Sequence, residues 1–215
     1  MPFIEAHIST SSTVFDLNAE HNHTITIDLF LRHNRPITFP TQNLRLFDSP
    51  MSKGGLTFTD TETGTEARRN RIFMCGPDHE GLLRDDNKEY FLTLHPGQKH
   101  TIQASISRME SGVGRVQLPP GSTAKEYREA NEAQPKVWKW WKAGNLDNGK
   151  TYRIGVDEGS AIKKWFEGST EELLRKPLDN RTDSKMNKEL IMINVTQPAE
   201  FTMKRPDSDG SLNWP

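Results

Sequence analysis

Three tryptophans, Trp138, Trp140 and Trp141, lie within four residues of one another and are interleaved with lysines. Indole rings stack on flat partners, and neighbouring ammonium groups attract anions and ring faces. Such a segment could bind a planar or anionic ligand, a sugar ring or a single-stranded nucleic acid. Trp165, followed by Phe166, is a further candidate contact. The same rings could instead pack in a core, because Trp is costly to expose, and the sequence leaves both interpretations open.

Histidine pairs of the His-x-His type can chelate a metal, because alternate residues of a strand point to one face. His21 and His23 form such a pair at the start of a strand-like run. His33 lies at the other end of that run, roughly 33 Å from His23 in an unbroken strand, so it cannot be the third ligand. Solvated loop histidines are the alternative interpretation. We therefore predict no metal site, and no motif indicates a cofactor.

Acidic residues occur in pairs that could supply a general acid and base. The candidates are Asp85-Asp86, Glu89, Asp157-Glu158 and Glu171-Glu172. Pairs of this kind are more often solvent-exposed residues or residues that cap a helix or turn, and we expect that role here. The basic run 68–71 is interpreted as a charged loop. Cys75 is the only cysteine, which excludes an intrachain disulfide, and we expect it to be a small buried residue.

Composition limits the function further. The chain has 215 residues, of which 33% are hydrophobic and 27% charged, with 13 prolines and 15 glycines. These values favour a loop-rich β fold with a modest core. The 28 basic and 29 acidic residues nearly cancel, so we expect neither nucleic acid nor an anionic membrane as partner. The first residues show no signal-peptide pattern and no run has transmembrane length, so the sequence predicts a soluble, cytoplasmic protein.

Alternating apolar residues predict the strands that would position these candidates. Tyr90–Ser107 contains two such runs around His95-Pro96-Gly97-Gln98, which predicts antiparallel strands with one buried face. His23–Arg32 is a second long strand, and Phe3–Ser9 is interpreted as an edge strand. Lys150–Val156 is a further strand. Two closing strands are expected at Glu189–Val195 and Phe201–Lys204.

Helical signals interrupt this pattern in the last third of the chain. Thr123 and Glu126 form a capping box, which predicts a helix that ends before Pro135. Residues 135–143 fit a helix and a strand almost equally, because Val and Trp are also strong strand formers. Two short helices are expected at Ser160–Phe166 and Ser169–Lys176. Residues 206–215 are expected to be a flexible tail.

Four segments resemble the N-terminal immunoglobulin-like domain of fungal deuterolysins and peptidyl-lysine metallo-endopeptidases. They read HTITIDLFLRHNRPITF, LTFTDTETG, LTLHPGQKHTI and LDNGKTYRIGV and span about Thr24–Val156. The pattern is also similar to that of uncharacterised fungal intracellular proteins that carry this sandwich without a protease. The resemblance implies an immunoglobulin-like sandwich. It does not imply peptidase activity, because the His-Glu-x-x-His motif of that group is absent.

We therefore expect a mainly β protein, an Ig-like antiparallel β-sandwich with a helical Trp-rich insertion. Residues 1–205 would form one domain, with insertions near 121–145 and 159–176. The expected function is a non-catalytic binding or interaction module whose partner is a small molecule or a protein. The alternative is a small fungal specialised-metabolism enzyme, a cyclase or isomerase, in which the insertion closes a hydrophobic pocket. A peptidase-associated domain that has lost its partner is a third possibility. The ligand and the oligomeric state stay open.

Overall fold

The computed structural model describes residues 1–17, 21–68, 82–112, 118–133, 136–141 and 146–205. Within these residues the chain is mainly β, as the sequence predicts, with several sheets and short helices. The expectations for Cys75, for positions 69–71 of the basic run and for the tail 206–215 lie outside the described residues.

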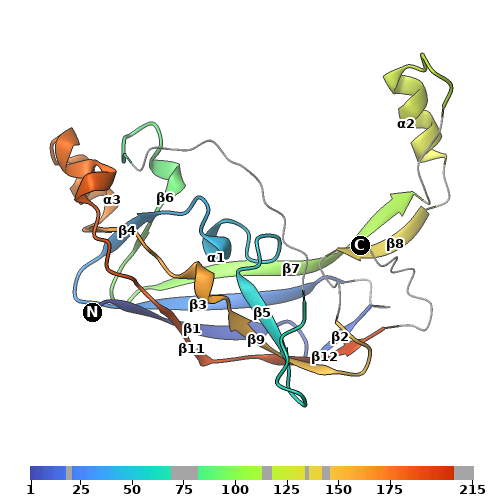
Figure 1. Cartoon of the computed structure of the whole chain (residues 1–215), viewed down its shortest axis with the longest axis horizontal. Coiled ribbons are helices and arrows are strands. Elements are labelled where there is room, and N and C mark those ends of the chain that lie inside the picture. Colours follow the sequence, from blue (N-terminus) through green and yellow to red (C-terminus); the bar gives the residue numbers. More distant parts are fainter. Residues whose placement is uncertain (18–20, 69–81, 113–117, 134–135, 142–145, 206–215) are drawn as a thin grey trace.

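The largest sheet has five strands in the order β11-β1-β3-β7-β8 (Figure 1). β3 pairs antiparallel with β1 and β7, and β11 pairs parallel with β1. β3 follows the predicted alternation, and its inward residues Ile25, Ile27 and Leu29 are all buried. The strands of this sheet are β1 (Phe3–Thr10), β3 (His23–Arg32), β7 (Lys99–Gly112), β8 (Lys136–Trp141) and β11 (Ile193–Gln197).

A four-stranded sheet, in the order β2-β12-β9-β5, shares one hydrophobic core with the five-stranded sheet. Its strands are β2 (Val14–Asp16), β5 (Leu56–Asp60), β9 (Thr151–Val156) and β12 (Glu200–Lys204). Buried residues such as Ile27 and Ala104 of the first sheet belong to the same cluster as Phe58 and Ile154 of the second. The two sheets therefore form a sandwich-like arrangement, with the core between them.

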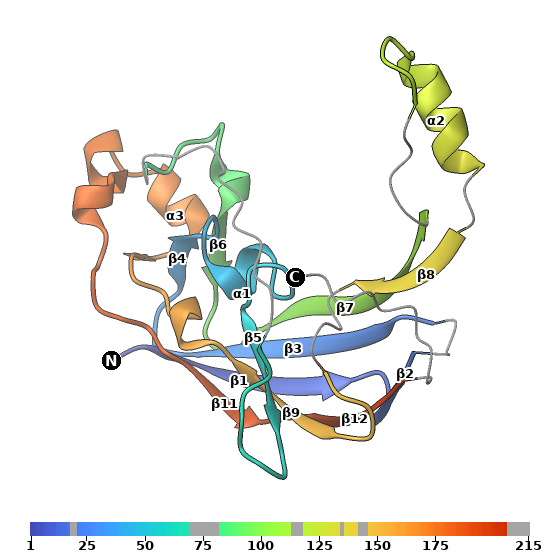
Figure 2. The ribbon, with the colours of Figure 1, turned by 45° about the vertical axis from the view of Figure 1, so that its right-hand side comes forward.

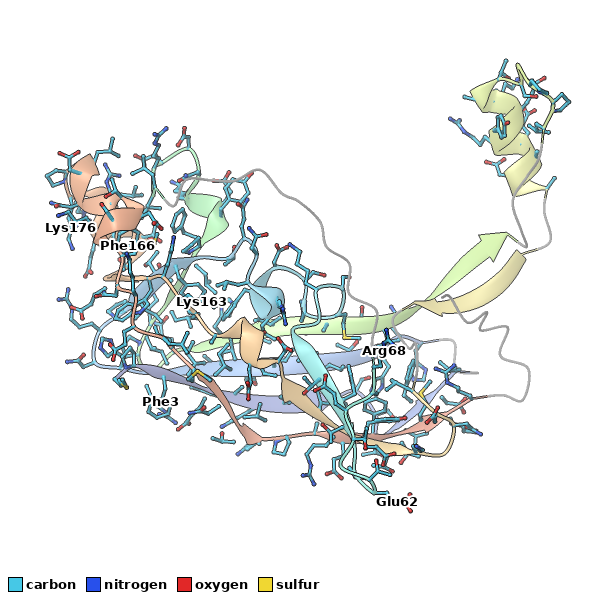
Figure 3. The ribbon with its side chains drawn as sticks, in the orientation of Figure 1. Phe3, Glu62, Arg68, Lys163, Phe166 and Lys176 are labelled. Carbon is cyan, nitrogen blue, oxygen red and sulfur yellow. The ribbon has the colours of Figure 1, made fainter. Side chains whose placement is uncertain are left out.

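A smaller unit covers one end of the molecule. It contains the three-stranded sheet β10-β4-β6 and a separate apolar cluster that includes Phe91, Phe166 and Leu173 (Figure 3). α3 begins at a capping box, in which the Ser169 hydroxyl accepts from the Glu172 amide at 3.2 Å. The elements are β4 (Ile37–Pro40), β6 (Phe91–Leu94), β10 (Phe166–Glu167) and α3 (Thr170–Leu174), with the other helices α1 (Arg45–Asp48) and α2 (Ala124–Glu132) and 3-10 turns at Lys88–Tyr90, Glu158–Ser160, Leu178–Arg181 and Asp183–Lys185.

Five aromatic rings join the two main sheets, and we call them the aromatic cluster. Phe201 is at its centre, and its ring centroid lies 5.1 to 6.3 Å from the other four. Offset and edge-on ring pairs at such separations add about 0.5–1.5 kcal/mol each beyond the buried area. The cluster consists of Phe15 (β2), His23 (β3), Phe58 (β5), Tyr152 (β9) and Phe201 (β12). All five residues are buried.

The structure corrects the pairing predicted for Tyr90–Ser107. Both strands are present, but β6 pairs with β4 and β7 pairs with β3, so the two strands belong to different sheets. The turn forms as expected, with the Gln98 amide donating to the His95 carbonyl at 3.2 Å and Gly97 at a φ of 71°. A turn reverses the chain without deciding which neighbour each strand pairs with, and here the chain passes from one sheet to the other.

Three further expectations differ from the structure. β1 is not an edge strand, because β11 and β3 flank it. Ser160–Phe166 is not a helix. Its backbone instead makes isolated bridges, Ile162 with Ile191 and Trp165 with Asn187, which tie the segment to the chain before β11. The penultimate strand is shifted to Ile193–Gln197, because these residues pair with β1.

We predict that Phe201→Ala lowers the free energy of unfolding by about 3–5 kcal/mol, because it removes the central ring of the aromatic cluster and leaves a cavity. Urea unfolding followed by circular dichroism measures this. The control is Glu200→Ala, whose exposed side chain pairs only with exposed Arg153 in the described structure and should change the value by less than about 0.5 kcal/mol. Equal effects of the two changes would contradict the central role of Phe201.

Candidate functional site

The second half of β7 leaves the two-sheet body. Residues 99–106 of β7 pair with β3, whereas residues 107–112 pair, within the described chain, only with β8. This two-stranded ribbon leads away from the sheets and is followed in space by α2 (Figures 1 and 2). We call residues 107–112, β8 and α2 the arm.

For residues 136–141 the structure decides between the two conformations left open for 135–143, and positions 135, 142 and 143 lie outside the described residues. Lys136–Trp141 is a strand, so within the described part of the predicted insertion the helix is α2. In the register with β7, Trp140 lies opposite Arg108 and Trp138 opposite Glu110. Opposite residues of an antiparallel pair share a face, and so do residues two apart. The register therefore places positions 138 and 140 on one side of the ribbon and position 141 on the other.

The face that carries Trp138 and Trp140 continues the core-facing side of β7. In the body of the sandwich Ala104 and Ile106 are buried on that side, while Thr101 and Gln103 point outward. Arg108 has the same parity as Ala104 and Ile106, so an unbroken strand extends the inner face of the sheet into the arm. Along this side of the ribbon the register therefore sets one basic position, 108, opposite 140 and one acidic position, 110, opposite 138.

α2 begins at the capping box that the sequence predicts. The Thr123 amide donates to the Glu126 carboxylate at 2.6 Å, and the Glu126 amide donates to the Thr123 hydroxyl at 3.3 Å. These bonds hold the pKa of Glu126 below its usual value. Tyr127 is 41% exposed, and most of the helix is exposed. α2 therefore contributes surface rather than core to the described structure.

Trp165 is not near the arm. It is 3% exposed, belongs to the main hydrophobic core and donates its indole N–H to the Glu189 carbonyl at 2.9 Å. His33 contacts it edge-on at 6.1 Å. For this tryptophan the structure agrees with the core interpretation, because both its ring and its one donor are satisfied within the protein. The four candidate residues thus occupy two separate places.

The histidine pair does not form a chelating unit. His21 is exposed, whereas His23 is buried in the aromatic cluster, where its ring stacks on Phe15 at 4.7 Å. Burial first, and then the nearby His21, lower the pKa of His23 to about 4. The interpretation as solvated loop histidines is therefore wrong for His23. His23 lies on the same strand face as Ile25, Ile27 and Leu29, and this alternation in the sequence could have predicted its burial.

Two of the paired carboxylates, Asp157 and Glu172, have structural roles. Asp157 caps the turn at Glu158–Ser160 by accepting from the Gly159 amide at 2.9 Å, and it forms an ion pair with Arg45. Glu172 completes the capping box of α3. Asp85, Asp86 and Glu89 are exposed.

Sequence reasoning missed one buried charge, Asp60. Its Oδ1 accepts from the Glu62 amide at 2.9 Å and its Oδ2 lies 3.0 Å from the Lys150 ammonium. Lys150, together with the backbone donors, lowers the pKa of this carboxyl, and Asp60 in turn raises the pKa of Lys150. Glu62, at the tip of the turn, is exposed (Figure 3). The four residues 60–63 thus form a stable turn rather than a reactive site.

We predict that Trp165→Ala lowers the free energy of unfolding by about 3–5 kcal/mol, because it opens a core cavity and removes the donor to Glu189. Lys163→Ala, two residues away and exposed (Figure 3), is the control and should change the value by less than about 0.5 kcal/mol. Denaturant unfolding of both variants measures the difference. A stable Trp165→Ala protein would show that Trp165 is not a core residue.

Two searches of the described residues are negative. No group of three or more His, Cys, Asp or Glu residues in them could hold a metal ion, and none of their helices is both long and apolar enough to cross a membrane. No family model, no curated protein and no solved structure matches this chain.

Proposed function

We propose that the protein is a non-catalytic interaction module with an immunoglobulin-like sandwich, and that the arm is its contact surface. One observation carries this proposal. β7 continues for six residues beyond its last pair with β3, and within the described chain only β8, the tryptophan strand, accompanies it there. A strand pair that extends past the edge of the paired sheet is a natural position for a contact surface, and binding is the function proposed for it.

The strand order supports the immunoglobulin-like assignment. In that fold, strands A, B and E are neighbours in one sheet and C, F and G in the other. Here β1-β3-β7 and β5-β9-β12 have the corresponding order. The hydroxyl of Tyr152, near the start of β9, accepts from the Asp147 amide at 2.8 Å, five residues upstream. This bond resembles the tyrosine corner found at the start of strand F.

One departure from the immunoglobulin order bears on the function. Strand D, which precedes strand E in the chain, normally lies beside it. The neighbour of β7 is instead β8, which follows β7 in the chain and pairs only with residues 107–112. β8 is thus an addition to the sandwich, consistent with a surface that serves a partner.

The enzyme alternative requires a lone histidine or carboxylate in an apolar cavity. His23 is buried in apolar surroundings, but its ring is stacked on Phe15 at 4.7 Å and lies 5.1 Å from Phe201. The rings of Phe15 and Phe201 therefore occupy the space next to the imidazole that a substrate would need in the enzyme alternative. Asp60 is neutralised by Lys150. These contacts favour the interaction module, with a protein or a small molecule that has a flat or anionic part as partner.

The test of this proposal is the double variant Trp138→Ser/Trp140→Ser. If β8 adds contact surface rather than core, as proposed, the free energy of unfolding should change by less than about 1 kcal/mol. The emission of the wild type should contain a red-shifted component that acrylamide quenches readily, and the double variant should lose it. Peptides selected from a random displayed library on the wild type should bind the double variant at least tenfold more weakly.

Gln103→Ser is the matched control, because Gln103 is an exposed residue of the same strand within the body of the sandwich. It should retain the binding of the selected peptides. A double variant that unfolds more readily by about 3 kcal/mol or more would show that Trp138 and Trp140 are core residues. Unchanged peptide binding by a folded double variant would show that the arm is not the contact surface.

A further inference from the structure

His23 lies where the two main sheets meet. It is the first residue of β3 in the five-stranded sheet, opposite Ile106 of β7. Its ring is 2% exposed and packs against Phe15 and Phe201, which belong to β2 and β12 of the four-stranded sheet. His23 is therefore the member of the aromatic cluster that the five-stranded sheet contributes.

The surroundings of the ring accept a neutral imidazole but not a charged one. The Nε2 atom is buried and has no hydrogen-bond partner in the described structure. A protonated ring carries N–H donors at both nitrogens, and an unpaired buried charge is strongly unfavourable. Burial accordingly lowers the pKa of His23 to about 4.

No described carboxylate offsets this penalty. From β2, Asp16 forms an ion pair with Lys204 of β12 at 2.7 Å. From β12 and β9, Glu200 and Arg153 pair with each other at 2.9 Å. β7 places the apolar Ile106 opposite the ring. Among the described residues, the neighbouring His21 also acts on the ring, and it lowers the pKa of His23 further.

We propose that His23 is a pH-sensitive switch between the two sheets, and that uptake of a proton by its ring separates β2 and β12 from β3. The opened state solvates the imidazolium and exposes the rings of Phe15 and Phe201. No such role is needed for the contact surface on the arm, so this proposal is independent of that function. It identifies an open state of the fold whose population grows as the pH falls below neutrality.

The direction follows from proton linkage. The pKa of His23 is lower in the closed state than the ordinary value of 6.5, so the open state binds more protons. The contribution of His23 to the stability of the closed state is therefore fully present above pH 6.5 and is lost as the pH falls toward 4. With these two pKa values, the opening equilibrium constant should rise about 20-fold between pH 7 and pH 5.

Hydrogen exchange of the intact protein, read by NMR, tests this proposal. Protection factors of the Thr202 and Met203 amides in β12 should fall about 20-fold between pH 7 and pH 5, following the linkage above. Those of Thr38 and Thr93 in the smaller sheet should stay constant. His23→Phe should abolish the change. His100→Gln is the control that retains most of it, because burial also lowers the pKa of His100, but outside the aromatic cluster.

A second measurement does not depend on any variant. An NMR titration of the wild-type imidazole should give a pKa for His23 near 4. A value of 6 or above would overturn the proposal. Equal loss of protection in β12 and in the smaller sheet would also overturn it, since that pattern indicates global unfolding. A His23→Phe protein that keeps the full pH dependence would assign the effect to other groups.

Discussion

The packing of Phe201 against rings from four other strands is the contact on which the rest of the structure depends. Phe15, Phe58 and Tyr152 come from the other three strands of the four-stranded sheet, and His23 comes from the five-stranded sheet. Only a third of the chain is hydrophobic. A small core of this kind relies on large rings, because each aromatic side chain removes far more surface from water than an aliphatic one. The neutral imidazole of His23 fits among these rings because it is also flat and can stack on Phe15.

The arm differs from this core in its backbone pairing. Within the described chain, β8 pairs only with residues 107–112 of β7, beyond the last pair between β7 and β3. A two-stranded ribbon is marginally stable when it stands alone. The proposed contact with a partner would give such a ribbon a role outside folding. The two packed sheets form the base from which it extends.

The strands with strict alternation could be predicted from the sequence, and the pairing of those strands could not. His23–Arg32 was readable because one face is continuously apolar. The partner of β6 was not, since a Pro-Gly turn fits both a hairpin and a crossing between sheets. Residues 136–141 were ambiguous because Val and Trp fit both periods, and only the pairing with β7 decides for a strand. Ser160–Phe166 lacks a helix because its backbone bonds are made to distant residues near 187–191. The burial of Trp165 could not be predicted either, because its core position depends on contacts with residues distant in sequence, such as the Glu189 carbonyl.

Native-state hydrogen exchange at neutral pH tests most directly the claim that the aromatic cluster holds the fold and the arm stands outside it. The slowest amides should be those of β3 and β9, which should exchange together with the free energy of global unfolding. The amides of residues 107–112 should exchange faster, through a local opening that leaves the sandwich intact. If residues 107–112 exchange as slowly as β3, the ribbon and its tryptophans are part of the cooperative core, and the arm is not a separate contact surface.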